Sequence, residues 1–162
     1  MRNKLQKMVN VTKKGRISVI VPLYGQFSIE RAIVSVESIL SQDISDLEVI
    51  ISEQGEKKHF PNINGAIHIF SYHRPKSELS DFNPGGIRNK GIINSTGEFV
   101  YTNDADIVFT DIRYLSMVKE VIETNQGKVL FRPKMRRLPL SDFATFNKLA
   151  EDYGIVGAIS RL

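Results

Sequence analysis

The chain has 162 residues, an average hydrophobic content of 41% and a net charge of +4, which fits one globular domain of ordinary size. It contains no cysteine, so a disulfide framework, a thiolate zinc site and a cysteine nucleophile are all excluded. No apolar run approaches the ~20 residues that a membrane-spanning helix needs.

Positive charge is concentrated in two segments. Residues 1–16 hold six basic side chains and no acidic one, and a second basic cluster occupies residues 132–137. Such clusters bind phosphates or an anionic membrane surface, and a solvated tail and loop are the alternative. We expect residues 1–16 to be a flexible leader and residues 17–162 to form one domain. Because no apolar stretch follows the leader, we expect a cytoplasmic location, with peripheral contact to the inner face of the membrane left open.

The first half of the chain alternates between strand-like and helix-like segments. Residues 17–21 are a nearly unbroken β-branched run, typical of a parallel strand buried on both faces, and we expect it to end at Pro22. Apolar residues then recur at helical spacing from 29 to 40, with Ser28 as the N-cap. Further strands are predicted at 47–52 and 66–70, the latter with His68 as an ordinary strand side chain.

The same alternation continues in the second half. Asn83 and Pro84 are typical of a helix start, with Asn at the cap and Pro in the first turn, and this helix is predicted to reach about residue 95. The remaining predicted elements are a strand at 98–102, a helix at 112–122 closed by Gly127, a strand at 128–131 and a short helix at 142–152. This order predicts an α/β domain with a mostly parallel sheet and right-handed crossovers.

Ligands bind beyond the carboxyl ends of the strands in such sheets, and polar or aromatic residues follow three of the predicted strands. The third of these groups contains Asp104 and Asp106, two carboxylates on a segment expected to be extended. They would repel each other unless they are solvated or neutralised by a divalent cation. Mg²⁺ and Mn²⁺ use few protein oxygens and complete their coordination with water and phosphates. The pattern therefore predicts a Mg²⁺ or Mn²⁺ site that holds a diphosphate, with a solvated acidic loop as the alternative.

Four segments in the right order resemble the motifs of family 2 glycosyltransferases. They are SVIVPLY at 18–24, LEVII at 47–51, GIRNKG at 86–91 with STGEFV at 95–100, and Asp104-Ala105-Asp106. The resemblance covers about residues 17–115. It implies the GT-A fold, a Rossmann-like nucleotide-binding sheet. It also implies transfer of a sugar from a nucleotide donor, usually UDP-linked, to an acceptor hydroxyl with inversion, while a metal holds the leaving diphosphate.

The resemblance also implies roles for single residues. The nucleotide-sugar-binding positions are Pro22, Tyr24, Glu53, Arg88 and Asp104, and the metal ligands are Asp104 and Asp106. Pro22 and Tyr24 would border the base pocket, with the Tyr24 ring against uracil. Glu53 would accept a hydrogen bond from the base or ribose. Arg88 would meet the uracil edge or the diphosphate, since its guanidinium suits planar and anionic partners. The alternatives are a packing role for Tyr24, an exposed turn acid at Glu53 and a solvated helix face at Arg88.

The chain departs from the family pattern at three places. Gly25 stands where the family commonly has Asn, and Glu53-Gln54-Gly55 stands where it commonly has Asp-Asp-Gly. An acid followed by Gln resembles galactosyl- and N-acetylgalactosaminyl-transferring relatives, including chondroitin-type polymerases. The family places its acceptor site and catalytic base well after Asp-x-Asp, so we expect the base beyond Leu162 and a C-terminally incomplete domain.

The expected partners are a nucleotide-sugar donor and a saccharide or lipid-linked acceptor, with no nucleic acid and with polysaccharide synthesis as the family-level context. Two other functions stay open: a non-catalytic nucleotide-sugar-binding module, and an unrelated nucleotidyltransferase that would release pyrophosphate.

Overall fold

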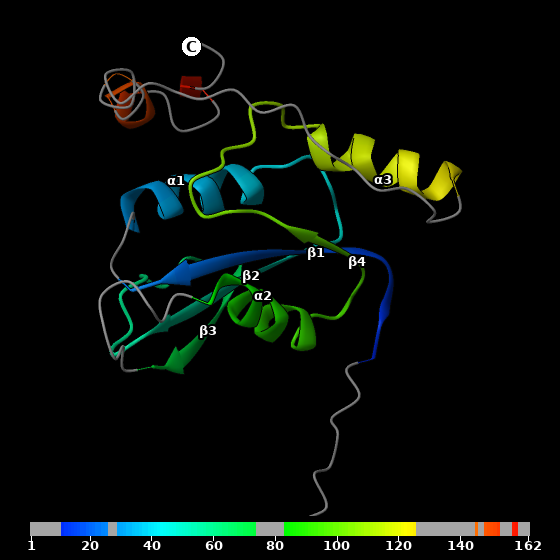
Figure 1. The fold of residues 1–162 in the computed structure, drawn as a ribbon. Helices are drawn as coiled ribbons and strands as arrows, with labels where there is room; N and C mark the ends of the chain where they lie inside the picture. Colours follow the sequence, from blue (N-terminus) through cyan, green and yellow to red (C-terminus); the bar gives the residue numbers. More distant parts are fainter. Residues whose placement is uncertain are drawn as a thin grey trace, which may run out of the picture.

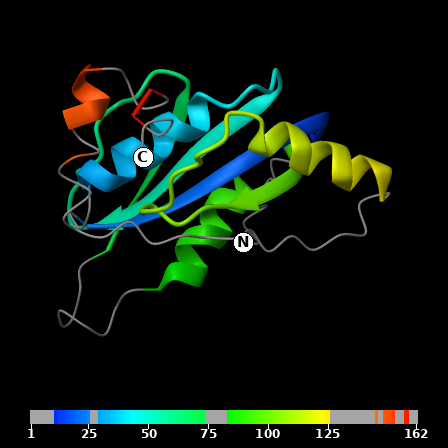
Figure 2. The same ribbon diagram turned by 90° about the horizontal axis from the view of Figure 1, so that it is seen from above.

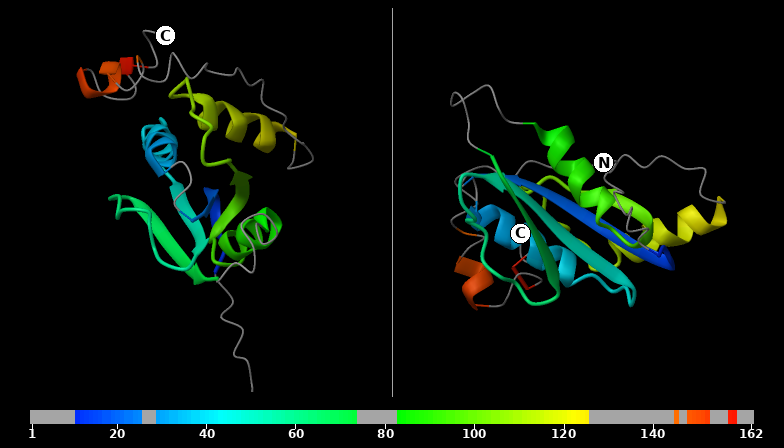
Figure 3. Two further views of the ribbon diagram at one scale, coloured as in Figure 1. Left: turned by 60° about the vertical axis from the view of Figure 1, so that its left-hand side comes forward. Right: turned by 90° about the horizontal axis from the view of Figure 1, so that it is seen from below.

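In the part of the chain that the structure describes, four parallel strands form one sheet in the order β3-β2-β1-β4. The structure is a computed structural model that describes residues 11–25, 29–73 and 83–125, together with 145, 148–152 and 157–158. Its elements are β1 (Lys13–Tyr24), α1 (Ile29–Leu40), β2 (Leu47–Gly55), β3 (Ala66–Tyr72), α2 (Pro84–Ile93), β4 (Gly97–Thr102) and α3 (Tyr114–Thr124). Helix α1 covers one face of the sheet and α2 the other, and α3 lies on the α1 side near β4 (Figures 1 and 3).

The two faces of the sheet follow the alternation of side chains along β1 and β2. One face packs against α1 and forms the main hydrophobic core, in which the strand residues are odd-numbered. These core residues are Ile17, Val19, Val21, Leu23, Val49 and Ile51, with Ala32, Val36 and Ile39 from α1. The even-numbered residues face α2, as the close approach of Gly91 to Ile20 and Ser52 demonstrates. Both faces are covered, which explains why these strands read as continuous apolar runs.

Strand β1 continues through Pro22 to Tyr24, so the prediction that Pro22 ends it was wrong. Proline is tolerated because of the side to which its nitrogen points. The carbonyl of Ile20 accepts a hydrogen bond from the N–H of Asn103, so the even-numbered residues of β1 direct their backbone polar groups towards β4. At Pro22, β4 has already ended at Thr102, and no strand hydrogen bond is lost there.

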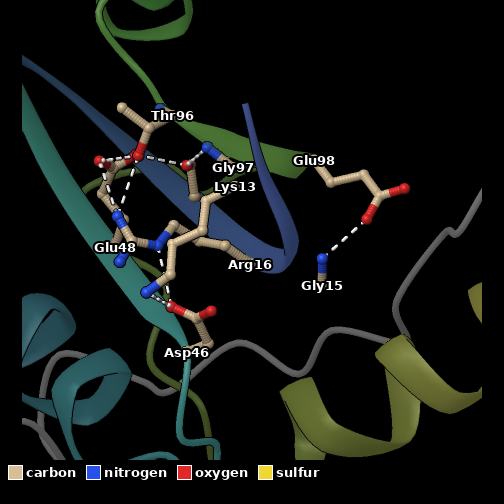
Figure 4. Close-up of polar contacts among 9 residues, drawn as sticks. Lys13, Gly15, Arg16, Asp46, Glu48, Thr96, Gly97 and Glu98 are labelled. Carbon is tan, nitrogen blue, oxygen red and sulfur yellow. Dashed lines mark hydrogen bonds and ion pairs between the residues drawn. The ribbon is translucent and has the colours of Figure 1, made fainter. Parts of the chain in front are cut away.

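The amino edge of the sheet is held by a network of polar side chains (Figure 4). The buried carboxylate of Glu48 accepts hydrogen bonds from the Ser18 hydroxyl and from the N–H and hydroxyl of Thr96, the last two at 2.8 and 2.7 Å. Arg16 lies 3.7 Å from the same carboxylate. Burial raises the pKa of Glu48, but the Ser18 and Thr96 hydrogen bonds and the Arg16 charge outweigh it and lower that pKa on balance.

The same network includes residues that were predicted to belong to the flexible leader, residues 1–16. Lys13 and Arg16 lie in β1 and both contact Asp46 Oδ1, at 3.0 and 2.9 Å. Both were expected to be part of a flexible basic segment, and instead they form ion pairs with the Asp46 carboxylate. The basic cluster at 132–137 lies outside the described residues, as do residues 1–10 of the leader.

The other predicted elements agree with the structure except at their ends. Strands β2 and β3 extend past the predicted 52 and 70 to Gly55 and Tyr72, and α2 stops at Ile93. Asn83 caps α2 by accepting the Gly86 N–H at 2.9 Å, and Pro84 is its first residue, as predicted. Ser28, Gly127 and the strand predicted at 128–131 lie outside the described residues. None of the described helices is long and apolar enough to cross a membrane.

Candidate functional site

The carboxyl ends of the strands meet at one edge of the sheet, as the sequence predicts. Tyr24 at the end of β1 is paired in register with Gln54 near the end of β2. The chain leaves β4 after Thr102, which is paired with Ile20 of β1, and so it runs past the last residues of β1. The segment that begins at Asn103, whose N–H donates to the Ile20 carbonyl at 2.9 Å, therefore starts beside β1 and leads towards its carboxyl end.

The turn after β1 explains one departure from the family pattern. Gly25 has a φ of 56°, in the left-handed region, and donates its N–H to the Gln54 carbonyl at 2.8 Å. Glycine adopts this conformation without steric cost, and Asn adopts it more readily than most other residues. Glycine is therefore suited to the turn that ends β1, at the position where the family commonly has Asn.

The side chains of Arg88 and Asp104 contact each other at this edge, through Nη2 and Oδ1. Arg88 is on α2, and α2 is fixed to the sheet by two close contacts. The hydroxyl of Ser52 donates to the Ile87 carbonyl at 2.8 Å. A Cβ at Gly91 would lie 2.4 Å from Ile20 Cγ2, so only glycine allows this approach. Two residues that the sequence assigns to one site are thereby brought together from different elements.

Asp104 and Asp106 lie on a turn and not on the extended segment that was predicted. The N–H of Ile107 donates to the Asp104 carbonyl at 3.0 Å, which closes the turn. Asp106 is exposed and has no hydrogen-bond or ion-pair partner among the residues that the structure describes. No group of three or more His, Cys, Asp or Glu side chains in the described ranges is arranged to hold a metal. Two exposed carboxylates fit a cation that takes its remaining ligands from water and phosphate.

Glu53 does not lie in an exposed turn, which was the alternative to its binding role. It is part of β2, it is fully buried, and as an odd-numbered residue it faces the α1 side of the sheet. Its carboxylate accepts the N–H of His59 at 2.7 Å and that of Phe60 at 3.4 Å. His68 Nε2 lies 2.7 Å away, although the angles are not those of a hydrogen bond. Internal partners therefore surround the Glu53 carboxylate, and its contact with a nucleotide base or ribose stays a prediction.

His68 is an internal side chain of β3, as predicted. Burial lowers its pKa most strongly, the charge of Lys58 lowers it further, and Glu53 raises it by a smaller amount. The imidazole packs edge-on against the Phe60 ring, with centroids 5.7 Å apart. Glu53 and His68 together hold residues 59 and 60 against the end of β2.

The sequence reasoning missed three residues at this edge. Gln54 follows Glu53 and therefore faces the opposite side of β2, and its buried Oε1 has no hydrogen-bond partner among the described residues. Asn103 and Ser35 are buried, and their side chains bond to each other and to the carboxylate turn. Strand alternation could have separated Gln54 from Glu53. A serine on the apolar face of a predicted helix, as at Ser35, also indicates a buried hydrogen bond. The sequence does not indicate that Asn103 is its partner.

Comparison with known proteins decides the family. Residues 18–139 match the model of the family described as "Glycosyl transferase family 2". The chain belongs to this family. This glycosyltransferase family 2 domain is 28% identical over 121 residues to an "Uncharacterized glycosyltransferase" of Rickettsia bellii (strain RML369-C). The aligned region covers 71% of this chain and 16% of that protein.

Solved structures similar to this family 2 domain include S. aureus TarS. TarS 1–349 matches with a TM-score of 0.55 and 22% sequence identity, and the match covers 79% of this chain and 39% of that structure. The structure of TarS matches with a TM-score of 0.53 and 21% identity, and the match covers 78% of this chain and 23% of that structure. TarS 1–349 in complex with UDP matches with a TM-score of 0.52 and 22% identity. These likenesses support the GT-A fold, and the chain spans well under half the length of each relative.

Proposed function

We propose that this domain binds a nucleoside diphosphate sugar, UDP-linked, at the carboxyl edge of its sheet and transfers the sugar to an acceptor hydroxyl with inversion. One observation carries the proposal: Arg88 of α2 and Asp104 after β4 contact each other at the edge where Tyr24 ends β1. Membership of family 2 supports the reaction class, and the UDP bound in a TarS structure supports the donor type.

The arrangement divides recognition among a few side chains. The Tyr24 ring, half-buried at the end of β1, would stack against the base, with Pro22 behind it. Gln54 would reach the base edge in place of Glu53, because its amide offers both a donor and an acceptor. Arg88 would bind the diphosphate or the base edge, and Asp104 would then be released to contact the ribose or a cation.

Asp106 would be the main protein ligand of Mg²⁺ or Mn²⁺. It is exposed, it has no partner among the described residues, and it stands two positions from Asp104 on the same turn. A cation bound there supplies charge stabilisation to the departing nucleoside diphosphate, as a Lewis acid. The protein would contribute the carboxylate positions, and Arg88, released from Asp104, would balance part of the diphosphate charge.

A turnover assay separates this proposal from its alternatives. The chain is incubated with a panel of UDP-sugars, Mn²⁺ and oligosaccharide acceptors, and released UDP and glycosylated acceptor are measured. Both products together support the transferase. Donor binding without either product favours a non-catalytic nucleotide-sugar-binding module. Pyrophosphate released from a nucleoside triphosphate would favour a nucleotidyltransferase. Failure to bind any UDP-sugar contradicts the proposal. The galactosyl-type donor and a contact with the membrane stay predictions for the same panel and for vesicle binding.

A further inference from the structure

The turn that carries Asp104 and Asp106 is held from behind by buried side chains. Asn103 is 2% exposed and donates from Nδ2 towards the Asp104 carbonyl at 3.1 Å and the Ile107 carbonyl at 3.0 Å. The same nitrogen lies 3.1 Å from the hydroxyl oxygen of Ser35 on α1. Ser35 is fully buried and donates its own proton to the Ile107 carbonyl at 2.7 Å. Both ends of the turn are thus tied to one helix.

Two further polar residues of the same helix face continue this pattern. We call Ser35, Ser38 and Gln42 the α1 polar row, since they recur at helical spacing and each is buried. The hydroxyl of Ser38 accepts the Phe109 N–H at 3.1 Å. Gln42, just beyond the end of α1, donates to the Asp111 carbonyl at 2.9 Å and accepts the Leu115 N–H at 3.0 Å. The row therefore holds the whole connection from β4 to α3 along the helix.

Polar residues are needed here because the connection has no regular secondary structure between β4 and α3. It runs beside α1 in the view from above the sheet (Figure 2). Backbone N–H and C=O groups that are buried must find partners, and this segment cannot supply them through a helix or strand of its own. The row provides partners at residues 107, 109, 111 and 115, which sets the register of the segment along the helix.

We propose that Asn103 and the α1 polar row are positioning residues for the donor site. They fix the Asp104–Ile107 turn in the free protein, so that the two carboxylates are already placed when a cation and diphosphate arrive. This inference rests on the proposed function for the identity of the ligand. It adds that α1, which carries no group facing the ligand in that proposal, sets the affinity of the cation-dependent part of the site.

The test compares Ser35 of α1 with Ser41, the residue that follows the end of this helix. Ser35→Ala removes the donor to Ile107 and the acceptor for Asn103. Ser41→Ala is the matched control, because its exposed hydroxyl bonds to Glu37 within its own turn, at 2.8 Å. Ser38→Ala acts further along the row and gives a graded variant. Ser35→Ala removes little volume, so it is preferred to a change at Asn103, whose loss would leave several groups unpaired.

The first measurement is the affinity for UDP with and without Mn²⁺. Loss of a buried hydrogen bond that holds the turn should weaken the Mn²⁺-dependent affinity of Ser35→Ala by about fivefold to tenfold. Its affinity without Mn²⁺ should stay within about twofold of the wild type, as should both affinities of Ser41→Ala. A purely structural role would lower the melting temperature and reduce both affinities of Ser35→Ala in proportion. That result would overturn the positioning role.

The second measurement needs no ligand. Amide exchange at Ile107, whose N–H closes the turn, should be about fivefold faster in Ser35→Ala than in the wild type and unchanged in Ser41→Ala. Unchanged exchange, or faster exchange with normal Mn²⁺-dependent affinity, would contradict the inference. If the wild type binds UDP no more tightly with Mn²⁺, the proposed function fails and the donor-site role fails with it. The exchange result then still decides whether the row holds the turn.

Discussion

Replacing Glu53 by Gln tests whether this carboxylate holds the fold or contacts a nucleotide. The group is fully buried and accepts two backbone hydrogen bonds, from the His59 N–H at 2.7 Å and from the Phe60 N–H at 3.4 Å. An amide would present a donor to these groups and would lack the negative charge. A hydrogen bond to a charged group contributes about 1.5–3 kcal/mol, so the loss of these two contacts should lower the free energy of unfolding by about 3 kcal/mol. For a domain of this size that is a fall of about 6–12 °C in melting temperature.

The assay follows thermal unfolding and UDP affinity of Glu53→Gln, with Glu120→Gln as the control. Glu120 is exposed on α3, and its side chain has no hydrogen bond or ion pair in the described part of the chain. We expect the control to unfold like the wild type. We expect Glu53→Gln to unfold earlier and to bind UDP within about threefold of the wild type at a temperature where it is folded. A normal melting temperature with UDP affinity lost would contradict the structural role of Glu53 and would place it in the base pocket.

Three further predictions concern packing and pH. Gly91→Ala should weaken UDP affinity and lower the melting temperature, because its Cβ would lie 2.4 Å from Ile20 Cγ2, whereas Gly85→Ala on the same helix should do neither. Equal behaviour of the two variants in calorimetry and titration would argue against the close contact. Glu48→Ala should cost about 3–5 kcal/mol in urea unfolding, since it leaves Arg16 and buried donors without their acceptor; a cost under about 1 kcal/mol would count against the network. The pKa of His68 is lowered in the folded state, so the unfolded chain takes up the proton first as the pH decreases. The free energy of unfolding should therefore fall as the pH decreases below about 6.5. The slope of unfolding free energy against pH should flatten in His68→Gln, and an unchanged slope would contradict the assignment.

The sequence predicted the sheet and the meeting of its strand ends because both depend on patterns that are local. The β-branched run in β1 and the Asn83-Pro84 start of α2 each have one structural interpretation. Pro22 misled the prediction, since its effect depends on where a different strand ends. That end point is a property of the sheet and cannot be read from the residues around the proline.

The burial of Glu53 within β2 was missed for a different reason. An acid after an apolar run has two interpretations, an exposed turn residue or a buried carboxylate with internal partners. The partners here are Phe60 and His59 from the following loop and His68 from β3. These partners lie 6 to 15 positions after Glu53, so the residues next to Glu53 do not indicate the contact. The α1 polar row was missed for the same reason, because Ser35 and Gln42 bond to residues about 70 positions away.

The most direct measurement is the Mn²⁺-dependent affinity for UDP in Asp106→Asn, set against Asp43→Asn. Both aspartates are exposed, and neither side chain has a partner in the described part of the chain, but Asp43 follows α1 at the opposite edge of the sheet. We predict that Mn²⁺ strengthens UDP binding to the wild type and to Asp43→Asn by at least about tenfold, and that Asp106→Asn loses this gain while it keeps its melting temperature. If Mn²⁺ strengthens UDP binding to Asp106→Asn as much as to the wild type, the carboxylate turn does not hold the cation and the account of the donor site is wrong.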